Sequence, residues 1–179
     1  AIALFDYSYV GRAGTSYGPS SSAPISAGNY TVTATINDTY YSGFKAVDFS
    51  IGKVAPVITT PPVATAINYA QSLASSTLGG GVASVPGTFA FANTATVPSG
   101  GTNSYPVIFT PTDNVNYSNV STSASVMVNQ VPISSSSIVF SAPASLVYNG
   151  AAKNFTATVS GATEAISFSY SYSGTNDTV

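Results

Sequence analysis

The stretch Asn37-Asp38-Thr39-Tyr40-Tyr41 combines residue types that bind cations or sugars. The carboxylate of Asp38 and the amide oxygen of Asn37 are oxygen donors of the kind that calcium takes. The rings of Tyr40 and Tyr41 can stack on the face of a sugar while nearby polar groups bind its hydroxyls. These residues therefore define a candidate ligand site, for a metal or for a carbohydrate.

A structural interpretation of the same pattern competes with the ligand site. A second stretch, from Asp113 to Tyr117, repeats the acid and the ring, yet one carboxylate in each stretch is sparse for a cation that takes six to eight oxygens. Asp side chains commonly accept hydrogen bonds from main-chain N–H groups two or three residues on. Because the pattern recurs, the sequence favours two structural corners, held by Asp38 and Asp113, with Tyr41 and Tyr117 packed behind them.

A carbohydrate site stays open as an alternative because the chain has 12 Tyr and no Trp. Tyr40 and Tyr41 are the weak ligand-binding candidates, and adjacent residues of an extended chain point to opposite faces. Tyr40 has no matching ring in the second corner, so it is the better candidate for exposure. The competing interpretation is that most tyrosines line half-buried strands, for which Tyr is well suited.

Tyr30 follows the small residues Ala27-Gly28-Asn29 and opens an alternating strand. This pattern is typical of the tyrosine corner of β-sandwiches, in which the hydroxyl binds main chain a few residues upstream. Tyr105 lies at the equivalent place before Asp113. We therefore expect both tyrosines to be structural corner residues.

Several kinds of chemistry are excluded by composition. The chain has no Cys and no His, which excludes thiolate chemistry, disulfides, Ser-His pairs and ordinary zinc sites. Only six residues are acidic, and 6% of all residues are charged, with a net charge of −2. We expect no enzyme, no metal site and no cofactor. The absence of a basic patch also argues against nucleic acid and anionic lipid as partners.

The lysines offer one covalent alternative. Lys45, Lys53 and Lys153 could form isopeptide crosslinks with Asn or Asp, but this chemistry needs a buried acid beside the pair, and acids are scarce here. Buried paired charges are rare in proteins in general. Measurement of the intact mass would reveal an isopeptide bond, because its formation with Asn releases ammonia and lowers the mass by about 17 Da.

The elements that must position these residues are strands. Apolar and polar residues alternate with period two, which predicts short β-strands, in residues 30–36, 47–51, 89–92, 105–109, 124–128, 155–159 and 168–172. Gly-, Pro- and Asn-rich turns separate them. The run Ser72–Leu78 is the one ambiguous piece. The pattern predicts an all-β fold of sandwich type, and it leaves open a β-grasp-like variant.

Internal similarity divides the chain into repeating units. Residues 27–54 resemble residues 100–131, with Asp38 and Asp113 lying 75 positions apart. Residues 165–174, AISFSYSYSG, resemble residues 2–11, IALFDYSYVG. We therefore expect residues 1–54 to be the C-terminal part of a unit, residues 55–131 a complete unit, and residues 132–179 the N-terminal part of a further unit. The whole would be a section of an array of two alternating domain types.

The sequence also resembles a known class of repeats. The stretches YSYVGRAGTSYGPSSSAPISAGNYTVTATINDTYYSGF and IVFSAPASLVYNGAAKNFTATVSG are similar to MBG or YGX-type repeats of large secreted bacterial surface proteins and adhesins. The stretch beginning PVITTPPVATAINYAQSLASSTLGGG is similar to the bacterial Ig-like repeats that accompany them. One departure is Ala70 after Tyr69, where the class usually has Gly. The resemblance implies Ig-like sandwich repeats and brings no catalytic residue.

From these features we expect a stalk or spacer repeat of an extracellular bacterial adhesin or surface fibre. Its partners would be neighbouring repeats of the same or adjacent chains, and a cell-surface glycan or protein is a further option. No stretch approaches the roughly 20 apolar residues of a membrane helix, so we expect no direct membrane insertion. Two alternatives remain, a carbohydrate-binding β-sandwich module and a filament subunit completed by strand exchange between chains.

Overall fold

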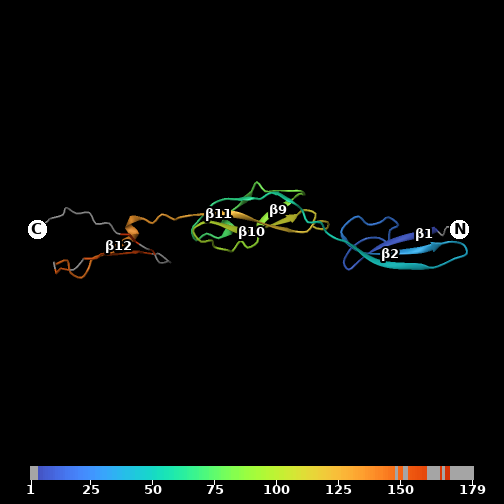
Figure 1. The fold of residues 1–179 in the computed structure, drawn as a ribbon, viewed down its shortest axis with the longest axis horizontal. Helices are drawn as coiled ribbons and strands as arrows, with labels where there is room; N and C mark the ends of the chain where they lie inside the picture. Colours follow the sequence, from blue (N-terminus) through green and yellow to red (C-terminus); the bar gives the residue numbers. More distant parts are fainter. Residues whose placement is uncertain (1–3, 148, 151–152, 161–165, 167, 170–179) are drawn as a thin grey trace. The chain divides into compact units, whose positions relative to one another are not determined.

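The computed structural model describes residues 4–147, 149–150, 153–160, 166 and 168–169 of the chain. Strands make up its regular structure, together with two 3₁₀ turns of three residues each (Figure 1). The predicted all-β fold class is therefore confirmed. The chain forms two compact units, residues 1–130 and residues 131–179, and each is described by itself. Residues 170–172 of the strand predicted at residues 168–172, and most of the stretch 165–174, lie outside the described residues.

The first sheet of unit 1 is antiparallel, with strand order β1-β2-β3. Its strands are β1 (Leu4–Arg12), β2 (Gly28–Asn37) and β3 (Phe44–Ile51). The register aligns Tyr9 with Val32, and Val32 with Val47. Since residues two apart share a face, one face of this sheet carries most of the apolar residues of the three strands, whereas Leu4, Val10 and Phe44 lie on the other face.

The opposite face of the first sheet is mostly polar. Thr31 Oγ1 donates to Asp48 Oδ1 at 2.6 Å, and Arg12 forms an ion pair with the same carboxylate at 3.0 Å. Asn37 Nδ2 donates to Asp6 Oδ2 at 2.9 Å. All of these contacts are exposed, so each stabilises the sheet only slightly. They identify this face as the one that faces solvent.

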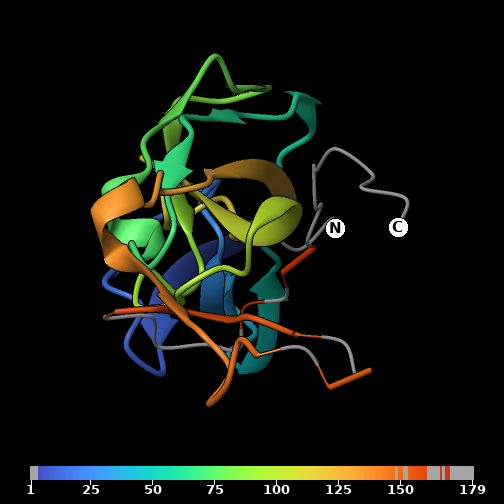
Figure 2. The same cartoon turned by 90° about the vertical axis from the view of Figure 1, so that its left-hand side faces the viewer.

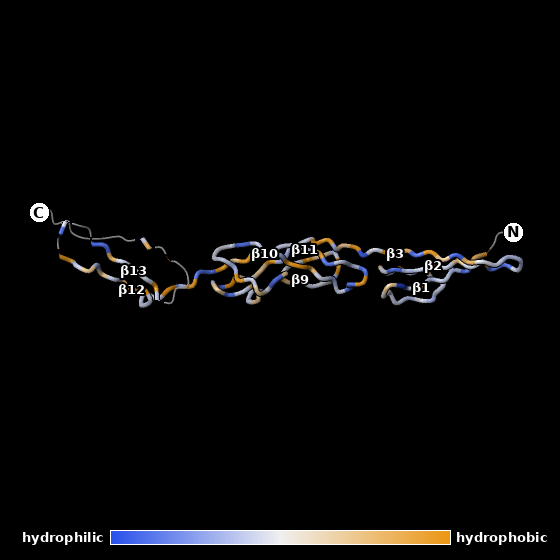
Figure 3. Tube along the Cα trace, turned by 90° about the horizontal axis from the view of Figure 1, so that it is seen from below, coloured by the Kyte–Doolittle hydropathy of each residue, from blue (hydrophilic) through white to orange (hydrophobic). Residues whose placement is uncertain are grey.

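The second sheet of unit 1 contains the main core. Its strand order is β6-β11-β10-β9, with β6 parallel to β11 and the other pairs antiparallel. The strands are β9 (Gly87–Phe91), β10 (Gly101–Pro111), β11 (Val120–Asn129) and β6 (Ile67–Asn68). More buried and more exposed residues alternate along β10 and β11, and apolar stretches of this sheet appear orange in Figure 3. The apolar side of this alternation is buried.

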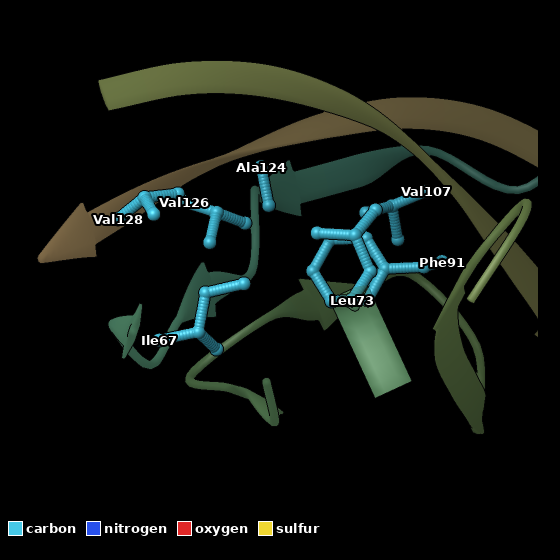
Figure 4. Packing of buried hydrophobic residues seen from close by; sticks show 7 residues of the cluster. All are labelled: Ile67, Leu73, Phe91, Val107, Ala124, Val126 and Val128. Carbon is cyan, nitrogen blue, oxygen red and sulfur yellow. The ribbon is translucent and has the colours of Figure 1, made fainter. Parts of the chain in front are cut away.

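A layer formed by residues 55–86 covers the apolar face of the second sheet. It consists of short pairs, β4 (Ile58–Thr60) with β8 (Val82–Ala83) and β5 (Val63–Ala64) with β7 (Leu78–Gly79). The ambiguous run Ser72–Leu78 contains the 3₁₀ turn η1 (Leu73–Ser75), whose first residue is buried. The resulting core joins both layers (Figure 4), and its members are Ile67, Leu73, Phe91, Val107, Ala124, Val126 and Val128.

The two sheets of unit 1 share strand order and register. Tyr30 pairs with Phe49, and Tyr105 pairs with Ala124, each 75 positions after its counterpart. Tyr9 pairs with Val32, and Phe91 pairs with Val107, again with equivalent partners. The strands β1, β2 and β3 therefore correspond to β9, β10 and β11. This structural match follows the similarity between residues 27–54 and 100–131.

Unit 2 is a small hairpin. The 3₁₀ turn η2 (Ser135–Ser137), the orange coil in Figure 2, leads into β12 (Ile138–Ser141), which pairs with β13 (Thr156–Val159). The alternation in residues 155–159 predicts the second of these strands correctly, whereas β12 is not anticipated. The predicted boundaries at residues 54 and 131 stay predictions.

Candidate functional site

The Asp38 corner is a loop between β2 and β3 that its acid holds together. Asp38 Oδ1 accepts hydrogen bonds from the main-chain N–H groups of Tyr40 and Tyr41, at 2.8 and 3.1 Å. Below it, the N–H of Ile36 donates to the carbonyl oxygen of Gly43 at 2.8 Å. This is the geometry of an Asx turn. The acid that the sequence offers as a metal ligand is therefore engaged with its own backbone.

Both tyrosines of this corner are exposed. Tyr40 exposes 89% of its surface and Tyr41 exposes 69%. The expectation that Tyr41 packs behind the corner is wrong, because the loop extends past the sheet and the segments that cover the sheet contact only its other end. The ligand-site hypothesis therefore rests on two exposed tyrosine rings, because the carboxylate of Asp38 is hydrogen-bonded to the main chain of its own loop.

The Asp113 corner lies between β10 and β11 and is held more tightly. Asp113 Oδ1 accepts from the N–H groups of Val115 and Asn116, both at 3.1 Å. Asp113 Oδ2 also accepts from Asn116 Nδ2 at 2.8 Å. The hydrogen bonds from the Asn116 side chain and main chain lower the pKa of Asp113, helped by Val115 and by the charge of Lys53. Each of these contacts stabilises the ionised carboxylate.

The same corner forms the joint between the first sheet and the second repeat. Val54 pairs with Tyr117 in a parallel bridge, in which the Val54 N–H donates to Asn116 O at 2.9 Å and the Ser118 N–H donates to Val54 O at 3.0 Å. Tyr117 is half-buried beside this bridge. Residues that the sequence suggests as a ligand set thus connect two repeats.

Side chains add two further bonds to this joint. The N–H of Ala27 donates to Asn116 Oδ1 at 2.8 Å, and Lys53 Nζ donates to the carbonyl oxygen of Asn114 at 2.5 Å. Asn116 therefore binds both the acid of its own corner and the loop before β2. The sequence does not indicate this role of Asn116, since no local pattern marks a contact across 89 positions.

An open recess of about 900 Å³ adjoins the joint. Residues 13–17, 26–30, 50–53 and 114–115 line it, so both repeats contribute. Its lining is mostly small and neutral, with Lys53 as the charged member, and the amine of Lys53 is already bound to Asn114. The recess brings no acid or nucleophile pair together.

Tyr30 has the environment of a tyrosine corner. It is fully buried, and its hydroxyl donates to Ser26 O, four residues upstream, at 2.7 Å. Its ring stacks on Phe49 with centroids 5.4 Å apart and meets the edge of Tyr17 at 5.7 Å. These contacts anchor the loop between β1 and β2 to the end of the first sheet.

Tyr105 does not reproduce this arrangement. It is half-buried and packs against the core of the second sheet, and within the described residues its hydroxyl makes no hydrogen bond. The residue four positions upstream, Gly101, belongs to β10 and pairs with Val128. Because that main chain lies in a ladder rather than in a turn, the expectation of a second tyrosine corner at Tyr105 is wrong.

Comparison of the chain with known protein families gives one match, over the strands and the corner just described. Residues 11–55 match the family model of the MBG domain. We call these residues the MBG segment. The domain is found in repeat proteins of bacterial surfaces and adhesins, so the resemblance to such repeats is confirmed. No curated protein and no solved structure gave a significant match to the chain.

The MBG segment contains Tyr30, the Asp38 corner, β2 and β3, and it ends next to the joint residue Val54. In the part of the chain that the structure describes, no three His, Cys, Asp or Glu side chains gather as a metal site. The described residues also include no helix long and apolar enough to cross a membrane.

The lysines lie on exposed or half-buried positions. Lys153 Nζ donates to Asn149 Oδ1 at 2.7 Å, in an exposed contact within unit 2. An isopeptide bond needs a buried lysine, amide and acid together, and this contact is open to water. The isopeptide crosslink stays a hypothesis that measurement of the intact mass would test.

Proposed function

We propose that this chain is a structural stalk or spacer section of an extracellular bacterial surface protein, without catalytic activity. The observation that carries the proposal is the joint between the MBG segment and the following repeat. There, hydrogen bonds of Val54, Asn116 and Ser118 continue from one repeat into the next. A spacer must transmit force and keep its direction, and a joint of this kind supports both.

The energetics of the joint fit this role. Main-chain hydrogen bonds contribute about 1 kcal/mol each in net terms, and a short linker alone would leave the repeats free to rotate. Lys53 and Asn116 bind across the joint from both sides. Bending the joint would break several of these hydrogen bonds at once, so the bonds resist bending cooperatively.

The surface composition supports an extracellular role. Only 6% of the residues are charged and the net charge is −2, so the polar surface depends on hydroxyl and amide groups. Such a surface presents no strong field to nucleic acid or anionic lipid. Its partners in this proposal are the neighbouring repeats of the same or adjacent chains.

Antibodies raised against the purified chain test the location. We expect them to label intact cells of the source organism, and mild external protease treatment should remove the signal. Labelling that requires permeabilised cells would overturn the extracellular assignment. An antibody against a cytoplasmic protein of the same cells serves as the control for membrane integrity.

Nitrogen-15 relaxation of the full chain tests the joint. Amides of β2 and β10 should report one common rotational diffusion tensor, because the joint couples the two sheets. Two independent tensors would show that the repeats reorient freely, and the spacer proposal would then lose its structural basis.

A second candidate function, carbohydrate binding, is supported by the exposed rings of Tyr40 and Tyr41. A glycan array probed with the purified chain tests it. Specific binding that is lost in Tyr40→Ala or Tyr41→Ala, but kept in the exposed control Ile25→Ala, would establish a glycan-binding role. No binding to any glycan would leave the spacer role alone.

A further inference from the structure

The turn Asn149-Gly150 lies in the connection between β12 and β13, and the spacer role makes no use of it. It is the one place in the sequence where Gly follows Asn. This dipeptide favours an intramolecular reaction, because the amide carbon of the Asn side chain lies within reach of the next main-chain nitrogen. Gly has no Cβ to obstruct that approach. The turn is therefore a candidate site of covalent change.

The structure leaves room around the two reacting groups. Asn149 and Gly150 are both exposed. A Cβ built on Gly150 would meet no atom of the described residues within 4 Å, apart from its chain neighbours. The φ of Gly150 is +73°, in the left-handed region that favours Gly over residues with a side chain. The main-chain nitrogen of Gly150 is thus open to approach, and water reaches the turn.

Lys153 contacts the side chain that would react. Its Nζ donates a hydrogen bond to Asn149 Oδ1 at 2.7 Å. Attack on the amide carbon of Asn149 places negative charge on this oxygen, and a cationic donor at hydrogen-bond distance stabilises the charge that develops there. The contact is exposed to water, so its effect on the rate should be much smaller than in an enclosed active site. Nucleophile, electrophile and charge-stabilising donor thus lie together in one short segment.

We propose that Asn149 is a site of spontaneous deamidation promoted by Lys153. The main-chain nitrogen of Gly150 loses its proton to water and bonds to Cγ of Asn149, and the Cγ–Nδ2 bond breaks to release ammonia. Water then adds to one of the two carbonyl carbons of the succinimide ring, which opens the ring and restores the N–H. The products are aspartate and isoaspartate, and the net reaction consumes water and releases ammonia without an oxidant or reductant.

Deamidation changes the turn in two ways. The new carboxylate would form an ion pair with Lys153 in place of the present hydrogen bond, and the formal net charge of −2 would become more negative by one. Isoaspartate also carries the main chain through the former side chain, which adds a methylene group to the turn. The inference goes beyond the spacer role and does not depend on where the protein is located.

Peptide mapping of the full chain by mass spectrometry tests the reaction, after incubation for days in mildly alkaline buffer. We expect the peptide with Asn149 to gain about 1 Da, and isoaspartate to be detected there by an isoaspartate-specific methyltransferase. Asn154, which precedes Phe155 in the same connection, is the internal control and should stay intact. An unchanged Asn149, or equal rates at Asn149 and Asn154, would overturn the proposal.

Variants of two residues separate the roles in the reaction. Lys153→Met removes the donor and should slow deamidation about threefold or more, whereas Lys153→Arg keeps a cationic donor and should react nearly as fast as the natural chain. A natural rate in Lys153→Met would overturn the role of Lys153. Asn149→Gln should gain no mass, because its longer side chain would have to form a larger ring.

The mass also distinguishes deamidation from the isopeptide bond. Succinimide formation lowers the mass by about 17 Da only until water opens the ring, so this species should decay to the product that is heavier by about 1 Da. A loss of about 17 Da that persists, with Lys153 joined to Asn149, would overturn the proposal and identify Lys153 as the nucleophile.

Discussion

The two sheets of unit 1 have the same strand order and register but differ in burial. Val107 on β10 is fully buried, whereas Val32, its counterpart on β2, is half-buried. The alternating sequence is equally clear in both strands. The difference comes from the layer of residues 55–86, which covers the second sheet with Leu73. A strand pattern thus provides an apolar face, and a second layer turns this face into a core.

The two acidic corners differ in the same way. Asp38 and Asp113 both accept bonds from the main chain of their own loops. The loop of Asp113 additionally binds Val54 and Ala27, whereas the loop of Asp38 exposes Tyr40 and Tyr41. One turn motif therefore forms a joint in one repeat and an exposed tip in the other.

The largest expected effect tests the difference in burial. Val107→Ala removes two methyl groups from a full core and should lower the local free energy of unfolding by about 2 kcal/mol. Val32→Ala at the matched position should cost less than about 1 kcal/mol, because less apolar surface is lost from the core. Hydrogen exchange of the β10 and β2 amides measures both. Equal losses at the two sites would mean that the first sheet is covered in solution.

The joint gives the next effect. Asn116→Ala removes the acceptor for Ala27 N–H and the donor to Asp113, so we expect a loss of about 1–2 kcal/mol and less common tumbling of β2 and β10. Asn119→Ala is the control, since within the described residues its side chain makes no hydrogen bond. If both variants kept the coupled tumbling of the natural chain, Asn116 would not hold the joint.

A smaller effect separates the two tyrosines. Tyr30→Phe leaves Ser26 O without its donor, which should cost about 1 kcal/mol. Tyr105→Phe removes a hydroxyl that makes no hydrogen bond with the described residues, so its stability should change little. Denaturant unfolding of both variants measures this pair. Similar costs at both positions would contradict the assignment of a corner at Tyr30 only.

The smallest expected effect is a change in how the stability of the fold depends on pH in the acidic range. Hydrogen bonds from Asn116 lower the pKa of Asp113 below its ordinary value of 3.8. A lowered native pKa means that the unfolded chain binds the proton more readily, so Asp113 stabilises the fold above about pH 4 and loses this contribution as pH falls through its native pKa. Asp113→Asn should flatten this part of the stability curve, measured by thermal unfolding between about pH 2 and 5. An unchanged acid slope would show that the corner does not favour the carboxylate.

Much of the fold can be predicted from local patterns. The alternation at residues 30–36, 105–109 and 124–128 correctly predicts β2, β10 and β11. The short strands of residues 58–83 cannot be predicted this way, because pairs of two or three residues carry no period. β12 is missed for a similar reason, since Ile138, Val139 and Phe140 are apolar without alternation.

The features of the candidate site also divide into those set by neighbouring residues and those set by distant residues. The Asx turns of Asp38 and Asp113 depend on neighbours two and three residues away, so their local sequence indicates them. The exposure of Tyr41, the missing corner bond of Tyr105 and the role of Asn116 depend on residues far along the chain. No local pattern can specify such contacts.

The sequence by itself determined the longer alternating strands, the acidic turns and the neutral surface, because alternation, turn chemistry and charge are properties of neighbouring residues. Only the tertiary structure decided which apolar face is covered and which acidic corner holds a joint. Burial and hydrogen bonding across the joint arise where distant segments meet, as Val54 meets Tyr117. Two similar turn motifs therefore have different environments within one chain.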